Sequence, residues 1–159
     1  RMLRDDKVVI DSNIKQCREI RGISLYNPIE IHKPLSNIIR PKLRQCFEKY
    51  TEEYEFMKSY IASYEYCDTY NIQKYKTEDD GYKFWHCEHG PHHEAATRIL
   101  AWTFYLNNAL SGTEFMYYPT VDAKMGRCVI WPAAFTHLHR SELPNKGLKY
   151  IATGWISFK

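Results

Sequence analysis

Histidines gather at two places in the sequence, and this clustering is the first feature that points to chemistry. One group is His86-Cys87-Glu88-His89, with His92 and His93 after it, and the other is Thr136-His137-Leu138-His139. On a strand, residues two apart project to the same face, so His86 and Glu88 would converge while Cys87 points away. One histidine of the later group would complete a set of two imidazoles and one carboxylate. This set suits iron(II) and leaves neighbouring coordination positions open.

The remaining residues of the first group have simpler interpretations. His89, His92 and His93 follow the expected ligand strand and are typical of a solvated polar loop. Cys87 would have to turn to the other face of the strand to bind the same ion, so we expect a small, partly buried side chain there.

A lysine provides the second chemical feature. The segment Lys149-Tyr150-Ile151-Ala152-Thr153-Gly154-Trp155 alternates with a period of two, which places Lys149, Ile151, Thr153 and Trp155 on one face of a strand. A lysine that faces inward needs an anion. A dicarboxylate that chelates a metal through one end would present its other carboxylate to this cation. The alternative is an edge-strand lysine that reaches solvent.

Two kinds of pattern predict the elements that position these residues. Residues 1–31 alternate apolar and polar side chains in short stretches, which favours strands and turns. Residues 34–62 carry Leu43, Phe47, Tyr50, Tyr54 and Phe56-Met57 at helical spacing, with Ser36 placed to cap the start. Pro41 predicts either a turn before it or a place in the first turn of the main helix.

Short segments separated by turn residues follow Asp68. They are Tyr70–Tyr75, Tyr82–Glu88, Thr97–Asn107, Glu114–Tyr118, Gly126–Trp131, Phe135–Arg140 and Lys149–Phe158. This spacing predicts an antiparallel sandwich or barrel. We expect one domain over residues 1–159, with strands and supporting helices in 1–70 and a jelly-roll core in 71–159, because no linker or repeat divides the chain.

Composition bounds the partners and the compartment. The net charge of +3 arises from 22 basic and 19 acidic residues scattered along the sequence, so neither nucleic acid nor a membrane surface is expected as a partner. No apolar run is long enough to span a bilayer, and the five cysteines lack disulfide or zinc spacing. We therefore expect a cytoplasmic protein, in the host cytoplasm if it is viral, and the sequence does not fix its oligomeric state.

The order of motifs over residues 71–158 adds a family resemblance. The motifs are Asn71-Ile72-Gln73-Lys74-Tyr75, Trp85-His86-Cys87-Glu88, Arg98 through Tyr105-Leu106-Asn107, Gly112-Thr113-Glu114-Phe115, Gly126-Arg127-Cys128-Val129-Ile130-Trp131-Pro132, His137-Leu138-His139-Arg140, and Lys149-Tyr150 with Trp155. In this order they resemble prolyl 4-hydroxylase-like 2-oxoglutarate oxygenases, especially compact bacterial and bacteriophage members. The resemblance implies a mainly β chain with N-terminal helices and a double-stranded β-helix, or jelly roll.

The resemblance also implies cofactors and ligands. Iron(II) would be held by His86, Glu88 and a distal histidine, and 2-oxoglutarate by Lys149 with support from Tyr75, Tyr105, Thr153 and Trp155, with O2 as the other cosubstrate. For the tyrosines, packing within a sheet is the alternative. The resembled enzymes place the basic anchor about ten positions after the distal histidine, which favours His139 and leaves His137 as the alternative.

Two departures bear on function. The resembled enzymes usually have Asp where this chain has Glu88, which is one methylene longer, and Ser111-Gly112 replaces a pair of glycines. By analogy we expect a dioxygenase that hydroxylates an unactivated C–H bond in a peptide or protein, with a prolyl residue as one candidate. The alternatives are a jelly-roll binding module without turnover and an oxygenase that acts on a non-peptide substrate. A nucleic-acid demethylase should show a basic groove, and none is apparent.

Overall fold

Two antiparallel sheets and one long helix make up the fold. The computed structural model describes residues 3–5, 29–76, 78, 80–143 and 146–159. The larger sheet contains, in spatial order, β1 (Leu3–Asp5), β6 (Cys128–Pro132), β3 (Arg98–Tyr105), β8 (Lys149–Phe158) and β2 (Tyr64–Tyr75). The smaller sheet contains β5 (Tyr118–Val121), β4 (Thr113–Phe115) and β7 (His139–Ser141). The prediction of a mainly β jelly roll is confirmed.

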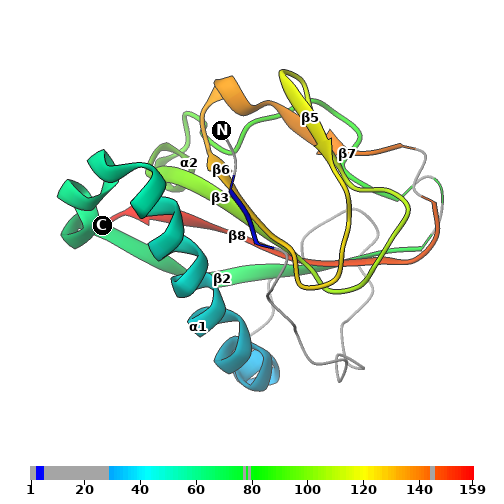
Figure 1. Ribbon diagram of the computed structural model, residues 1–159, viewed down its shortest axis with the longest axis horizontal. Coiled ribbons are helices and arrows are strands. Elements are labelled where there is room, and N and C mark those ends of the chain that lie inside the picture. The colour runs from blue at the N-terminus through cyan, green and yellow to red at the C-terminus, as the bar shows by residue number, and fades with distance from the viewer. Residues whose placement is uncertain (1–2, 6–28, 77, 79, 144–145) are drawn as a thin grey trace.

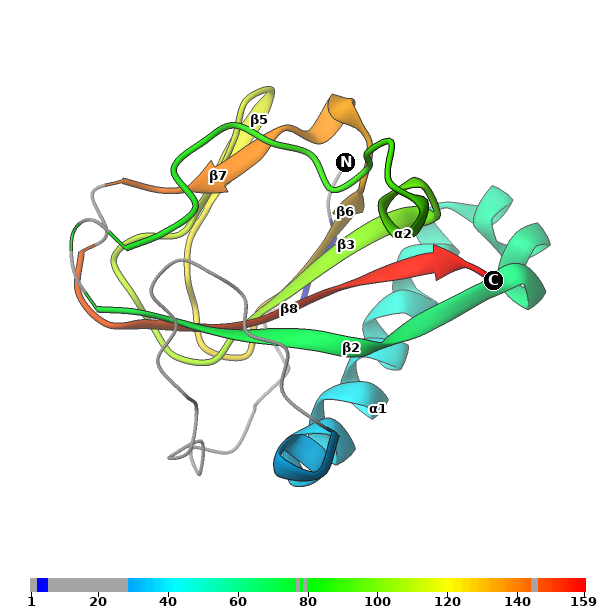
Figure 2. The ribbon, with the colours of Figure 1, turned by 180° about the vertical axis from the view of Figure 1, so that it is seen from behind.

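The larger sheet is covered on both faces. Side chains that alternate along its strands separate into two cores: Leu100, Trp102, Phe104 and Ile156 belong to the core that includes α1 (Ile29–Glu53), whereas Ala101, Tyr105, Val129 and Trp131 belong to the core with the smaller sheet. Figures 1 and 2 show α1 on one side of the larger sheet and the smaller sheet on the other. The second core therefore occupies the interior between the sheets, and we call its side of the larger sheet the inner face.

Helix α1 presents a buried stripe to the sheet. Ile39, Leu43, Phe47 and Tyr50 recur at helical spacing and are buried, as an amphipathic helix against a sheet requires. The helix begins at Ile29 and continues through Pro41, so both expected positions of this proline, after a turn and in the first turn of the helix, are wrong. Proline supplies no N–H to the carbonyl four residues earlier, and that residue, Asn37, is exposed, where water can satisfy the carbonyl.

Three further expectations differ from the structure. Ser36 lies within α1 and hydrogen-bonds the hydroxyl of Tyr70 at 2.8 Å, so it does not cap the helix. Phe56 is exposed, because α1 ends at Glu53 and a 3-10 helix, η1 (Glu55–Ser63), changes the helical phase. Of the strands predicted in residues 1–31, β1 is present, Ile29 already belongs to α1, and residues 6–28 lie outside the described residues.

Two short helices complete the described elements, α2 (His93–Ala96) and η2 (Phe135–His137). Among the described residues, no helix combines the length and the apolar character that crossing a bilayer would require.

Gly154 allows β8 to pass beneath the indole ring of Trp102. A Cβ atom at this position would lie 2.7 Å from the Cζ2 atom of that buried ring. We expect Gly154→Ala to lower the free energy of unfolding by about 1 to 3 kcal/mol, the usual cost of overpacking a core. Urea denaturation measures the change. Gly90→Ala is the matched control, because its added methyl would meet no atom closer than 3.6 Å. Equal stability of the two variants would show that Trp102 gives way freely.

Candidate metal centre

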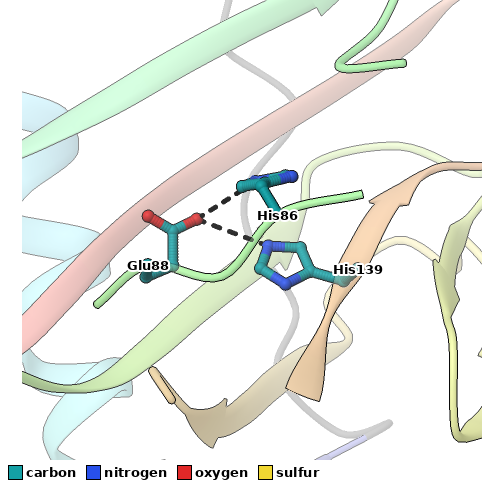
Figure 3. Close-up of side chains that lie close together, drawn as sticks. All are labelled: His86, Glu88 and His139. Atoms are coloured by element: carbon teal, nitrogen blue, oxygen red, sulfur yellow. Dashed lines mark ion pairs between the residues drawn. The ribbon is translucent and has the colours of Figure 1, made fainter. Parts of the chain in front are cut away.

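Three side chains from two distant parts of the sequence converge between the sheets. His86, Glu88 and His139 each offer one ligand atom, and these atoms all lie within 4.8 Å of one another. The Glu88 Oε1 atom is 3.5 Å from His86 Nε2 and 3.3 Å from His139 Nε2. Figure 3 shows both imidazoles directed at the same carboxylate oxygen. Two ligands bound at about 2.1 Å to one ion can be at most about 4.2 Å apart, and both distances satisfy this limit.

A backbone bridge holds the two histidines together. The His86 N–H donates to the carbonyl of His139 at 3.2 Å, and the His139 N–H donates to the carbonyl of His86 at 2.9 Å. Beyond His86 the chain leaves β7, and the Glu88 N–H donates to the carbonyl of Ala133 at 3.0 Å. The predicted strand over Tyr82–Glu88 is therefore reduced to this isolated bridge, although the side chains of His86 and Glu88 still converge.

Both imidazoles are oriented by backbone carbonyls. Nδ1 of His86 lies 3.0 Å from the carbonyl oxygen of Phe84, and Nδ1 of His139 lies 3.0 Å from that of His137. A carbonyl oxygen only accepts, so each Nδ1 carries a hydrogen and each neutral ring has its lone pair on Nε2. The two Nε2 atoms are those that face Glu88 Oε1. This is the tautomer that a metal-binding histidine uses when its other nitrogen donates to the protein.

Glu88 makes further contacts through its other oxygen. Oε2 accepts a 2.7 Å hydrogen bond from the Trp155 indole and lies 3.5 Å from the guanidinium of Arg98. Burial alone would raise the pKa of this carboxyl, but the contacts from His139, His86 and Trp155 outweigh burial and hold the pKa well below its usual range. Glu88 is therefore a carboxylate at neutral pH.

His137, the alternative distal ligand, lies outside this group. In the strand predicted over Phe135–Arg140, His137 and His139 would face the same side because they are two residues apart. That strand is not formed as predicted, because His137 ends the 3-10 helix η2 and β7 begins at His139. The ring of His137 stacks on Tyr118, with centroids 4.6 Å apart, and its Nδ1 pairs with the Thr136 hydroxyl. Within the described part of the chain, the group of potential metal ligands comprises His86, Glu88 and His139.

Lys149 faces inward, as predicted, and is only 1% exposed. Its ammonium donates to the carbonyl of Gly112 at 3.1 Å and lies 4.9 Å from the centre of the Tyr75 ring. Burial lowers the pKa of Lys149 to about 8, and the carboxylate of Glu142 partly opposes this shift. An ammonium has three N–H bonds. The described residues thus leave this buried cation with capacity for an additional acceptor.

The four residues predicted to support Lys149, which are Tyr75, Tyr105, Thr153 and Trp155, all lie on the larger sheet. Tyr75 is directly opposite Lys149 in the pairing of β2 with β8, and its hydroxyl bonds Gln73. The Tyr105 hydroxyl lies 2.7 Å from that of Thr113, and burial raises the pKa of Tyr105 to about 12. The Thr153 hydroxyl donates to the carbonyl of Trp102. Their role toward a ligand stays a prediction.

Arg98 was not assigned a role in the sequence. The pairing of β3 with β8 shifts between Arg98 and Leu100, and such an irregularity changes which face a side chain takes. Simple alternation from Ala101 and Tyr105 on the inner face places Arg98 toward α1. The structure instead places its guanidinium against Trp155 and Glu88, on the inner face.

A family model and several solved structures resemble this chain. The model of the 2OG-Fe(II) oxygenase superfamily matches residues 70–157. No curated protein matches. A prolyl 4-hydroxylase from Phytophthora capsici is 19% identical, with 68% of this chain and 40% of that chain covered and a TM-score of 0.49. The viral collagen prolyl hydroxylase of Paramecium Bursaria Chlorella virus-1, in its 2OG complex, is 21% identical, with 74% and 73% covered and a TM-score of 0.48.

A third similar structure is a prolyl hydroxylase from Trichoplax adhaerens in complex with a peptide fragment of the hypoxia inducible factor oxygen degradation domain. It is 18% identical, with 57% of this chain and 43% of that chain covered and a TM-score of 0.47. The present chain thus spans less than half of the Phytophthora and Trichoplax proteins. Because the family model matches residues 70–157, more than half of the sequence, the chain belongs to the 2OG-Fe(II) oxygenase superfamily.

Proposed function

We propose that this protein is an iron(II)- and 2-oxoglutarate-dependent dioxygenase that hydroxylates an unactivated C–H bond in a peptide, with a prolyl residue as the first target to test. The observation that carries this proposal is the convergence of two oriented Nε2 atoms and one carboxylate oxygen at a single point. Family membership supplies the reaction type. The peptide class rests on the order of motifs in the sequence, which resembles that of prolyl hydroxylases.

The residues fit the metal that the family implies. His86, Glu88 and His139 would hold iron(II) as two neutral imidazoles and one carboxylate, the set typical of non-haem iron oxygenases. When bound, iron(II) with O2 and 2-oxoglutarate supplies the oxidising power for hydroxylation, and 2-oxoglutarate leaves as succinate and CO2. The Nδ1 contacts to Phe84 and His137 leave Nε2 as the nitrogen that each ring offers to the metal.

Lys149 would bind the distal carboxylate of 2-oxoglutarate. Its ammonium is buried, held from one side by the carbonyl of Gly112 and covered by the ring of Tyr75. A carboxylate would accept the remaining N–H bonds in a charge-assisted contact, which is stronger than a neutral hydrogen bond. The surrounding protein shields the Lys149 ammonium from water, and the lower local dielectric constant strengthens that contact further.

The inner core would exclude water from the reaction. Phe115 and Trp131 lie against the ring of His139, at centroid distances of 5.6 and 4.9 Å. These apolar surfaces leave the Nε2 side of the ring as its polar face. Exclusion of water prevents unproductive oxidation and keeps the cosubstrate contacts strong.

The reaction itself is tested by anaerobic reconstitution followed by turnover. We expect iron(II) with 2-oxoglutarate to give a weak visible charge-transfer band and to raise the melting temperature, because ligands that bind only the native state stabilise it. On admission of O2, a panel of proline-containing and proline-free peptides should identify a substrate that stimulates succinate release. A protein that binds iron and 2-oxoglutarate but releases no succinate with any peptide would favour a binding module or a non-peptide substrate.

The distal ligand is tested by exchanging each histidine of the second group. We expect His139→Ala to abolish iron binding and succinate release, because two remaining ligands cannot hold the ion tightly. His137→Ala is the matched control, since His137 lies outside the ligand group, and its loss should weaken iron binding by no more than about 10 to 100-fold. Equilibrium dialysis with iron determination measures both. Retention of iron by the first variant and its loss from the second would make His137 the ligand.

Lys149→Ala tests the cosubstrate anchor. We expect the requirement for 2-oxoglutarate to rise steeply while metal affinity is kept, because truncation of one partner of a buried charged contact costs about 2 to 5 kcal/mol. Titration of 2-oxoglutarate against the metal-loaded protein measures the change. An unchanged requirement would place the anchor elsewhere.

The pH dependence of binding provides a second arm of this experiment. Lys149 has a pKa of about 8 in the free protein, so its ammonium loses a proton as the pH rises through 8. The carboxylate prefers the charged form, so 2-oxoglutarate affinity should be constant below pH 8 and fall above it. Lys149→Arg remains charged across this range. The affinity of this variant for 2-oxoglutarate should not fall above pH 8, even if it is weaker than that of the unmodified protein at every pH.

A further inference from the structure

The two oxygens of Glu88 have separate partners. Oε1 faces the Nε2 atoms of His86 and His139, at 3.5 and 3.3 Å. Oε2 points to the opposite side, where the Trp155 indole N–H donates to it at 2.7 Å and the Arg98 guanidinium lies 3.5 Å away. One oxygen is thus directed at the ligand group and the other at two donors of the larger sheet.

These two donors also support each other. The Arg98 guanidinium lies 3.7 Å from the centre of the Trp155 ring, and it donates to the backbone carbonyl of Glu88 at 3.3 Å. The guanidinium is therefore held by a stacked ring, a backbone oxygen and a carboxylate oxygen. A planar group fixed in this way loses little further freedom when it binds an anion.

The contacts of Glu88 Oε2 matter because this ligand is a glutamate and not the shorter aspartate. Glutamate has one more rotatable bond than aspartate, so its carboxylate has more orientations available. A carboxylate can bind a cation through one oxygen or through both. Binding through both oxygens of Glu88 would use a coordination position that the proposed reaction needs open.

We propose that Trp155 and Arg98 are positioning residues that hold Glu88 Oε2 and so make Glu88 a one-oxygen metal ligand through Oε1. This pair, the Trp155–Arg98 clamp, adapts the site to glutamate in the ligand motif. It gives Trp155 a different task from the one expected in the sequence, where it lined the 2-oxoglutarate pocket. The inference rests on the proposed function, because it requires that the three-residue group binds a metal.

The test measures metal affinity without 2-oxoglutarate or turnover. Co(II) is the probe, because it prefers similar ligands to iron(II) and its visible spectrum reports its coordination. We expect Trp155→Phe, which removes the indole N–H and keeps a ring, to weaken Co(II) binding about 10 to 100-fold and to alter the bound spectrum. Trp102→Phe is the matched control, since its buried indole nitrogen has no partner among the described residues, and its affinity and spectrum should match those of the unmodified protein.

A double-mutant cycle separates positioning from packing. Glu88→Asp shortens the side chain by one methylene, and we expect a carboxylate that reaches the metal from there to lose the contact with Trp155. Trp155→Phe should therefore weaken Co(II) binding by less than about threefold in the Glu88→Asp background, since coupled residues are not additive. An equal loss in both backgrounds would mean that Trp155 acts through packing alone, and would overturn the proposal.

Arg98→Lys keeps the positive charge but removes the planar guanidinium that stacks on Trp155. This variant provides the test if Trp155→Phe fails to fold. We expect it to weaken Co(II) binding by more than about threefold. Unchanged affinity in every clamp variant that folds would overturn the clamp while leaving the proposed function standing. Absence of Co(II) and iron(II) binding by the unmodified protein would instead refute the proposed function.

Discussion

The candidate centre depends on the two backbone hydrogen bonds between His86 and His139. They join the segment after β2 to the first residue of β7, and a backbone hydrogen bond of 3.0 Å from the Ser141 N–H to the carbonyl of Tyr82 continues the contact along that strand. Both ligating nitrogens, the orientation of the rings and the approach of Glu88 follow from this bridge. The site is consequently built by main-chain pairing, with the side chains supplying chemistry at positions that the backbone has already fixed.

Strand β8 organises the rest of the interior. It lies between β3 and β2 and contributes Lys149 at one end and Trp155 toward the other. The same strand sends Ala152 and Ile156 to the core beneath α1. Because successive side chains alternate, the packing against α1 fixes the orientation of Lys149 and Trp155 on the opposite face. The hydrophobic core beneath α1 and the candidate site thus lie on opposite faces of the same strand.

The sequence was sufficient for features that depend on local periodicity. The antiparallel sheets, the buried stripe of α1 and the inward Lys149 follow from spacings of two or of about 3.6 residues, and the jelly roll follows from the family resemblance. His86 and Glu88 converge as expected, although the strand that was to bring them together is reduced to an isolated bridge. Features that depend on register or on local irregularity could not be obtained in this way. The 3-10 turn that separates His137 from β7, the helix that continues through Pro41, and the placement of Arg98 arise from contacts with residues distant in sequence, which spacing does not encode.

The register shift before Leu100 makes the length of the chain at this point as important as its composition. If the shift were lost with every residue kept, regular alternation would turn the guanidinium toward the packed interface with α1, where an unpaired charge is costly, whereas deletion of Ile99 would place Arg98 directly before Leu100 and keep it on the inner face. A substitution of Ile99 that keeps the residue count would leave the shift in place. Related sequences that lack the extra residue can therefore keep an arginine on the inner face through a regular ladder, and an alignment with such a sequence should place its gap at Ile99 so that the two arginines correspond.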